Sequence, residues 1–209
     1  AYPARLVSLH AHRFSQRHGL VWGSVCADWG DVSVLGLFAP AGHTTYIEAQ
    51  SPIAINPYAN AMYIIAMQNF AELLQPTAPA EAGVWRARAA NTSKNAMHWL
   101  WMDDKQKFRP HLYDIGPMCG DSDGSASRHC WPSTPSPFRN ISGFDEDAIY
   151  YHGATAVAIE AGLLTKPQVA AALQKMRANV AAAAALPGSH GQRLTLGLTM
   201  WPPYPVGVF

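Results

Sequence analysis

The feature that most constrains the fold is an alternation between helices that are apolar on all sides and helices that are apolar on one side. Residues 58–74 and 146–163 carry apolar side chains around nearly the whole helical circumference, which is typical of buried helices. Residues 3–17, 81–102 and 167–185 instead place apolar residues on one stripe and charged residues opposite. This alternation predicts inner and outer helices packed as antiparallel hairpins.

The connections between these helices alternate in length as well. Pro76 and Pro79 mark a short turn after the first inner helix, and Gly162 loosens the end of the second. We also expect short strands at 108–113, after the third helix, and at 194–200, within the last long connection. The long connections themselves run over 20–57, over 116–145 and from 186 onward. We therefore expect an all-α fold with its short turns on one rim, and its long loops, short β-hairpins and inner-helix N-termini on the other.

Composition limits the classes of function. The 209 residues are 49% hydrophobic and 14% charged, which is enough for one sizeable core and predicts a single domain over 1–209. The net charge of +1, without a basic patch, argues against nucleic acid as a partner. The longest near-apolar stretches are far shorter than a bilayer span, so we expect no membrane span. No leader peptide is visible, so we expect a mature product or a piece of a longer chain.

A short segment in the first long connection is the leading candidate for a binding or catalytic site. Asp28 and Asp31 flank Trp29 and Gly30, in a chain with only 14 acidic residues. Trp offers a flat apolar face and Asp offers a proton or an acceptor, a combination that suits the apolar faces and polar edges of sugars. The competing interpretation is a tight turn in which Asp28 bonds local backbone N–H groups.

Four further residues fall at the same predicted rim. Tyr58 and Asn60 lie at the start of an inner helix and could bind hydroxyl groups, although Asn60 could instead cap the helix. Trp201 and Tyr204 lie in the last connection. Trp201, like Trp29, is a candidate stacking platform, against the commoner role of core packing. Together these residues form one candidate carbohydrate site.

Several segments resemble, in chain order, the six-hairpin glycosidase superfamily with its (α/α)6 barrel. They are GLVWGSVCADWGD (19–31), NPYANAMYIIAMQNFAELL (56–74), EAGVWRARAANTSKNAMHWLWMDDKQKFRPHLYD (81–114) and LTLGLTMWPPYPVGVF (194–209). The resemblance implies an inverting glycoside hydrolase or a relative of one, in which one carboxylic acid protonates the leaving oxygen and a second carboxylate activates water. Asp31 and Asp28 would be the candidates for the acid or for substrate binding.

A full barrel of this kind has twelve helices, whereas the chain predicts about five. We therefore expect a partial (α/α)6 toroid, with the remainder of the barrel or other protein chains as possible partners. The alternative function is a non-catalytic carbohydrate-binding or structural component of an extracellular or cell-surface assembly. A second carboxylate separates the two, and the remaining acidic candidates for a base are Glu48 and the run Asp145, Glu146 and Asp147. Asp145 and Glu146 could instead stabilise a first helical turn.

Cysteines and sequons suggest the secretory pathway or the extracellular space. Cys119 and Cys130 bracket a loop rich in Gly, Ser and Asp and could form a disulfide, which would leave Cys26 over. Asn140 opens an Asn-Ile-Ser glycosylation sequon, and Asn91 opens a second one inside a predicted helix, where it would be a poor acceptor.

Other chemistries find little support in the sequence. Asp121 and Asp123 suggest a calcium loop, but the twelfth position is Pro132 and not Glu. There is no zinc-ligand spacing and no Gly-rich phosphate loop. His152, inside a buried helix, is expected to be a hydrogen-bonded core histidine. We therefore expect no cofactor and no metal.

Overall fold

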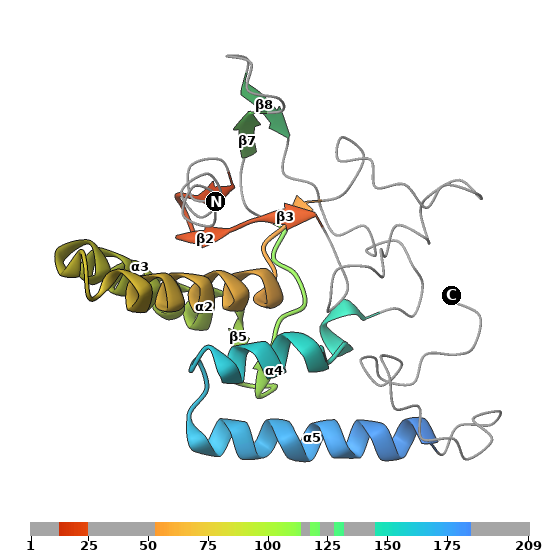
Figure 1. Cartoon of the computed structure of the whole chain (residues 1–209). Coiled ribbons are helices and arrows are strands. Elements are labelled where there is room, and N and C mark those ends of the chain that lie inside the picture. The colour runs from red at the N-terminus through yellow and green to blue at the C-terminus, as the bar shows by residue number, and fades with distance from the viewer. Residues whose placement is uncertain (1–12, 25–52, 114–117, 122–127, 132–144, 185–209) are drawn as a thin grey trace.

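The computed structural model describes residues 13–24, 53–113, 118–121, 128–131 and 145–184, and the structural statements below concern these residues. This part of the chain is mostly helical (Figure 1). Its helices are α2 (Pro57–Leu74), α3 (Pro79–Leu100), the short 3-10 helix η3 (Glu146–Ala148), α4 (His152–Glu160) and α5 (Lys166–Ala184).

The first inner helix and its outer neighbour form a hairpin as predicted. Asn56 caps α2, because its side-chain oxygen accepts the backbone N–H of Ala59 at 2.8 Å, and Pro57 occupies the first turn, where no N–H is needed. At the other end the Ala78 N–H donates to the Leu74 carbonyl, and α3 begins at Pro79. The sequence chemistry at both ends thus sets the length of α2.

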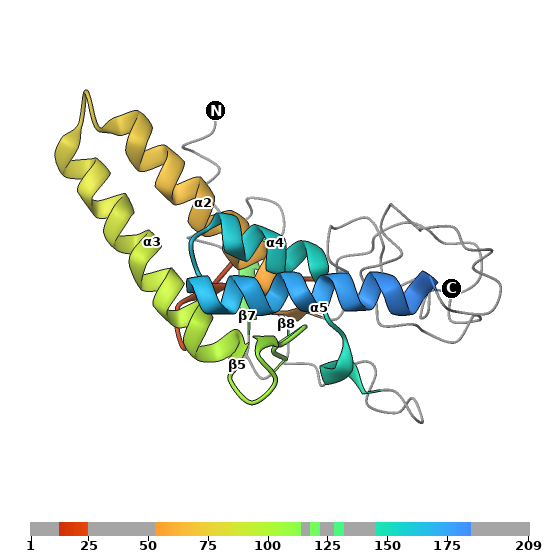
Figure 2. The same cartoon turned by 90° about the horizontal axis from the view of Figure 1, so that it is seen from below.

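The apolar stripe predicted for the outer helix is confirmed. The buried residues of α3 recur at helical spacing: Ala82, Trp85, Ala89, Thr92, Ala96 and Leu100. The expectation that α2 is buried all round is only partly correct, because Met62 is 45% and Leu73 is 76% exposed. The hairpin tip, where Leu73 lies, projects beyond the other helices (Figure 2), so nothing in the described chain covers it.

The second inner helix is shorter than predicted. In place of one helix over 146–163, η3 is followed by extended backbone at Ile149 and Tyr151, and α4 begins only at His152. Ile149, Tyr151 and Ala154 are buried together, and Tyr58 packs against them. In the extended conformation, the apolar side chains of Ile149 and Tyr151 are buried together. A continuous helix would have pointed them in different directions around its axis. α5 matches its predicted range within one residue at each end.

The prediction of a helix over 3–17 is wrong for the part that the structure describes. Strand β1 (Phe14–Ser15) pairs antiparallel with β2 (Leu20–Val21). Gly19 permits this hairpin with its φ of 63°, and its N–H donates to the Ser15 carbonyl. Burial of Leu20 and of its apolar neighbours favours the strand over a helix. Residues 1–12 lie outside the described residues.

Short antiparallel pairs complete the described structure. They are β3 (Gly23–Ser24) with β4 (Ile53–Ala54), β5 (Trp101–Met102) with β6 (Lys107–Phe108), and β7 (Met118–Asp121) with β8 (Arg128–Trp131). A single bridge joins Ile55 to Leu112, so the strand expected over 108–113 is present in short pieces. The strand expected over 194–200 lies outside the described residues.

The helices are arranged as two hairpins, with α4 against α2 and α5 against α4 (Figures 1 and 2). The short turns, before α3 and before α5, lie toward one end, and the N-termini of α2 and α4 lie toward the other (Figure 1). The short turns and the inner-helix N-termini thus lie at opposite ends, as predicted, whereas most of the long loops lie outside the described residues and a closed or partial toroid stays a prediction. None of the described helices is long and apolar enough to span a bilayer.

Candidate functional site

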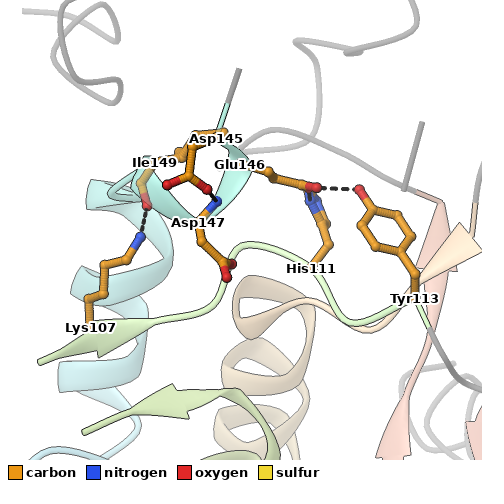
Figure 3. A network of polar contacts seen from close by, with 7 residues as sticks. All are labelled: Lys107, His111, Tyr113, Asp145, Glu146, Asp147 and Ile149. Atoms are coloured by element: carbon orange, nitrogen blue, oxygen red, sulfur yellow. Dashed lines mark hydrogen bonds and ion pairs between the residues drawn. The ribbon is translucent and has the colours of Figure 1, made fainter. Parts of the chain in front are cut away.

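A carboxylate held by two aromatic side chains is the centre of the candidate site. The Tyr113 hydroxyl donates to Glu146 Oε1 at 2.7 Å, and His111 Nδ1 lies 2.7 Å from the same oxygen (Figure 3). An ionised carboxylate can only accept, so Nδ1 is the donor in that contact. The His111 side chain is fully buried and that of Glu146 is 14% exposed. Glu146 is therefore oriented by its neighbours while keeping contact with solvent.

Strand geometry explains why these two donors meet one carboxylate. His111 and Tyr113 flank Leu112, whose N–H and C=O both bond Ile55, at 2.8 and 3.0 Å. Alternate side chains in an extended segment point to opposite faces. Leu112 accordingly joins the hydrophobic core, while His111 and Tyr113 both reach Glu146.

The same bridge places the 111–113 segment, which holds Glu146, beside the residue that follows β4. Ile55 lies between β4 and Asn56, the cap of α2. In the β3–β4 pair, Ser24 is opposite Ile53. The connection over 25–52 therefore leaves and rejoins the described fold beside the N-terminus of α2.

A pocket of about 430 Å³ lies on the other side of η3, between the β5–β6 hairpin and α5. Its lining is mostly charged or polar: Lys105, Gln106, Lys107, Asp145, Asp147, Tyr150, Ala171 and Lys175. Figure 3 shows Lys107 approaching Ile149 from one side, while Glu146 points away toward His111 and Tyr113. The short helix η3 thus separates two polar clusters.

Lys107 is the unusual group of this pocket. Its residue is only 7% exposed, and its Nζ donates to the Ile149 carbonyl. Burial lowers the Lys107 pKa to about 8, and Asp147 opposes that shift while Lys105 adds to it. Asp147 itself lies 3.9 Å from Lys105 in a solvent-exposed pair, which contributes little to stability.

His152 is hydrogen-bonded as expected, but it is half-buried at the first position of α4 and not inside a buried helix. Asn179 of α5 lies 3.0 Å from its Nε2, so the side-chain amide can donate to the neutral ring. Burial lowers the His152 pKa, and Lys175 acts in the same direction. The contact therefore joins the first residue of α4 to α5 and favours an uncharged imidazole.

Of the predicted substrate-binding residues, Asn60 has a different role in the structure. It is fully buried, its Oδ1 accepts the Val21 N–H at 2.9 Å, and its Nδ2 donates to the carbonyls of Val21 and Asn56. The side chain fastens β2 to α2 and has no exposed surface to offer a ligand. The helix cap suggested for it belongs to Asn56.

The structure tests few of the other predicted site residues. Tyr58 is half-buried against the Ile149 cluster. The backbone register sets Cys119 opposite Cys130 in β7–β8, and a disulfide between them stays a prediction. The remaining predicted residues lie outside the described chain: Cys26, Asp28, Trp29, Asp31, Glu48, Asn140, Trp201 and Tyr204.

Sequence reasoning missed His111, Tyr113 and Lys107. The first two had a usable signal, because a His-x-Tyr spacing in a predicted strand places both side chains on one face. Lys107 had none, since a lysine in a short hairpin ordinarily lies in solvent. In the part of the chain that the structure describes, no cluster of His, Cys, Asp and Glu side chains could hold a metal ion.

Comparisons with known proteins returned nothing: no family model, curated protein or solved structure matches the chain.

Proposed function

We propose that this chain is part of a carbohydrate-acting domain that hydrolyses a glycosidic bond with inversion when the domain is complete. The supporting observation is the Ile55–Leu112 bridge. It joins the oriented Glu146 carboxylate to the end of the fold from which the segment with Asp28 and Asp31 departs. An inverting glycosidase needs two carboxyl groups on one rim, and this arrangement could supply them.

The roles follow from the chemistry of inversion. One carboxylic acid protonates the leaving oxygen, and a carboxylate about 6.5–9.5 Å away activates water from the opposite face of the sugar. We assign the acid to Asp31 or Asp28 and the base to Glu146. Tyr113 and His111 would keep Glu146 in one rotamer, so that reorientation does not add to the barrier.

Apolar surfaces would supply much of the sugar affinity. We propose that Trp29, Trp201 and Tyr204 stack on sugar rings, with Tyr58 contributing from the start of α2. Exposed apolar side chains at Met62, on α2, and at Val84, on α3, offer contact to the remainder of a barrel or to another chain.

We also propose an extracellular or secretory-pathway location, with a Cys119–Cys130 disulfide and a glycan on Asn140. Opposed residues of an antiparallel pair have Cα atoms about 4.5–5.5 Å apart, which is within the range that a disulfide spans. The register of β7–β8 supports the pairing on that ground.

The test is a panel of polysaccharides and oligosaccharides, scored for binding and for release of reducing ends by the full chain. Asp31→Asn, Asp28→Asn and Glu146→Gln are compared with Asp104→Asn, which changes an exposed carboxylate on the β5–β6 turn. We expect at least about a hundredfold loss of rate for Glu146→Gln and for one of the two Asp variants, but not for Asp104→Asn.

The products separate the remaining possibilities. Anomeric NMR of the first product should show inversion, and retention would contradict the assigned mechanism. Binding without cleavage, unchanged in all four variants, would favour the non-catalytic component. Neither binding nor cleavage of any carbohydrate would contradict the proposal as a whole.

A further inference from the structure

We propose that Lys107 is a nucleophilic lysine that forms an imine with a small aldehyde or ketone entering the pocket beside it. The inference rests on the β5–β6 hairpin, η3 and α5, and it does not depend on the carbohydrate activity proposed above.

The first ground is the position of the amine. Lys107 is buried but lines the pocket, whereas Lys105, two residues earlier in the same hairpin, has a side chain that is 39% exposed. The Lys107 Nζ donates to the Ile149 carbonyl, and no carboxylate of the described residues forms an ion pair with it. An amine held by a neutral acceptor can lose a proton without leaving an unpaired carboxylate behind.

The second ground is the electrostatic setting. Burial lowers the Lys107 pKa to about 8; Lys105 and Lys175 act in the same direction, while Asp147 and Asp145 oppose it. An ordinary lysine has a pKa of about 10.4, so near neutral pH Lys107 holds a far larger fraction of free amine. The free amine is the form that attacks a carbonyl.

The reaction balances with water as the only other product. The amine nitrogen attacks the carbonyl carbon, and the C–N bond forms as the carbonyl π electrons move to oxygen. A proton passes from nitrogen to that oxygen and gives a carbinolamine. Protonation of its hydroxyl and loss of water then leave a protonated C=N bond, which gives the neutral imine when the nitrogen returns that proton. Asp145 and Asp147, which line the same pocket, can carry the protons.

A competing interpretation is a site for an anion held by the three lysines. The pocket charges argue against it, because Asp145 and Asp147 line the same walls and offset two of the three positive charges. A neutral carbonyl compound needs no such surplus of positive charge. The pocket volume of about 430 Å³ is sufficient for a compound of a few carbon atoms.

The experiment treats the folded chain with glycolaldehyde and sodium cyanoborohydride at about pH 7.5 and locates the reductively trapped adduct by peptide mapping. We expect Lys107 to be modified roughly tenfold faster than Lys105 or Lys166, after allowance for the weaker nucleophilicity of a less basic amine. The Lys107 rate should level off above about pH 8, near its pKa. Lys94→Arg, on the exposed face of α3 and outside the pocket, should leave the Lys107 rate unchanged.

Two results would overturn the inference. The first is equal or slower labelling of Lys107 relative to Lys105 in the folded chain. The second is a pH profile of Lys107 that keeps rising in parallel with that of Lys105. Urea-unfolded chain is the reference, in which the preference should vanish. Because the labelling rates are measured on the wild-type chain, the test does not depend on whether a Lys107 variant folds.

Discussion

Asn60 and Lys107 are both buried polar residues, but their surroundings differ. The neutral Asn60 amide makes three hydrogen bonds to backbone groups. The Lys107 amine donates to one carbonyl among the described residues, and its pKa is lowered. A fully satisfied neutral group fixes structure, and a buried amine without an ion pair is available for chemistry. The comparison separates a residue that holds the fold from one that can react.

The largest effect is expected for Asn60→Ala. The variant leaves the N–H and C=O of Val21 without their partner, and we expect a loss of roughly 3 kcal/mol in the free energy of unfolding. Urea denaturation measures it. Asn91→Ala, on the exposed face of α3, is the matched control and should change stability by less than about 0.5 kcal/mol. Similar losses of stability for the two variants would contradict the role of Asn60 in holding the fold together.

A disulfide between β7 and β8 would stabilise the fold by a covalent bond, unlike the hydrogen bonds of Asn60. If Cys119 and Cys130 are bonded, Cys119→Ser should cost about 2–3 kcal/mol through the larger entropy of the unfolded chain. Cys26→Ser is the control. Thiol counting and the urea midpoint, each with and without reductant, measure the effect, and free thiols at both positions in unreduced material would contradict the bond.

The pH dependence of stability tests whether burial perturbs the Lys107 amine, the reactive residue of the comparison. Folding lowers its pKa to about 8, so the unfolded chain binds more protons between that value and the ordinary one of about 10.4. Wild-type stability should therefore rise relative to Lys107→Met as pH increases through this interval, by about 2 kcal/mol after allowance for solvent screening. Denaturation curves of both proteins at several pH values test this. A constant difference would mean that folding does not perturb the amine.

His152 should give the smallest change. Its pKa is lowered in the folded chain, so the unfolded chain takes up a proton first as the pH falls. Stability should decline below the ordinary histidine range, about pH 6.5, and His152→Gln should reduce that decline. Identical acid limbs for the two proteins would show that the Asn179 contact does not depend on the charge of the ring.

Periodicity and end signals predicted the α2–α3 hairpin well. These signals act locally and can therefore be read from the sequence: the helix starts at Pro57 and Pro79, and the apolar stripe through Trp85. The helix expected around 149–151 failed because tertiary burial prevailed over local propensity. The expected helix at Phe14 failed because the Gly19 turn and burial of Leu20 favour a strand.

The site was less predictable for a related reason. Glu146 lies more than thirty positions after His111 and Tyr113, and the three meet only because the Ile55–Leu112 bridge directs the 111–113 segment. No local pattern encodes that pairing. The burial of Lys107 depends in the same way on η3, which comes some forty residues later in the chain.

The pairing of Ser24 with Ile53 has a consequence for how this chain can change over evolutionary time. Because the ends of the 25–52 segment are held together by the fold, lengthening the segment costs only the added loop entropy, about 0.6 kcal/mol for each doubling. Added length in this connection would therefore cost little stability through loop closure alone.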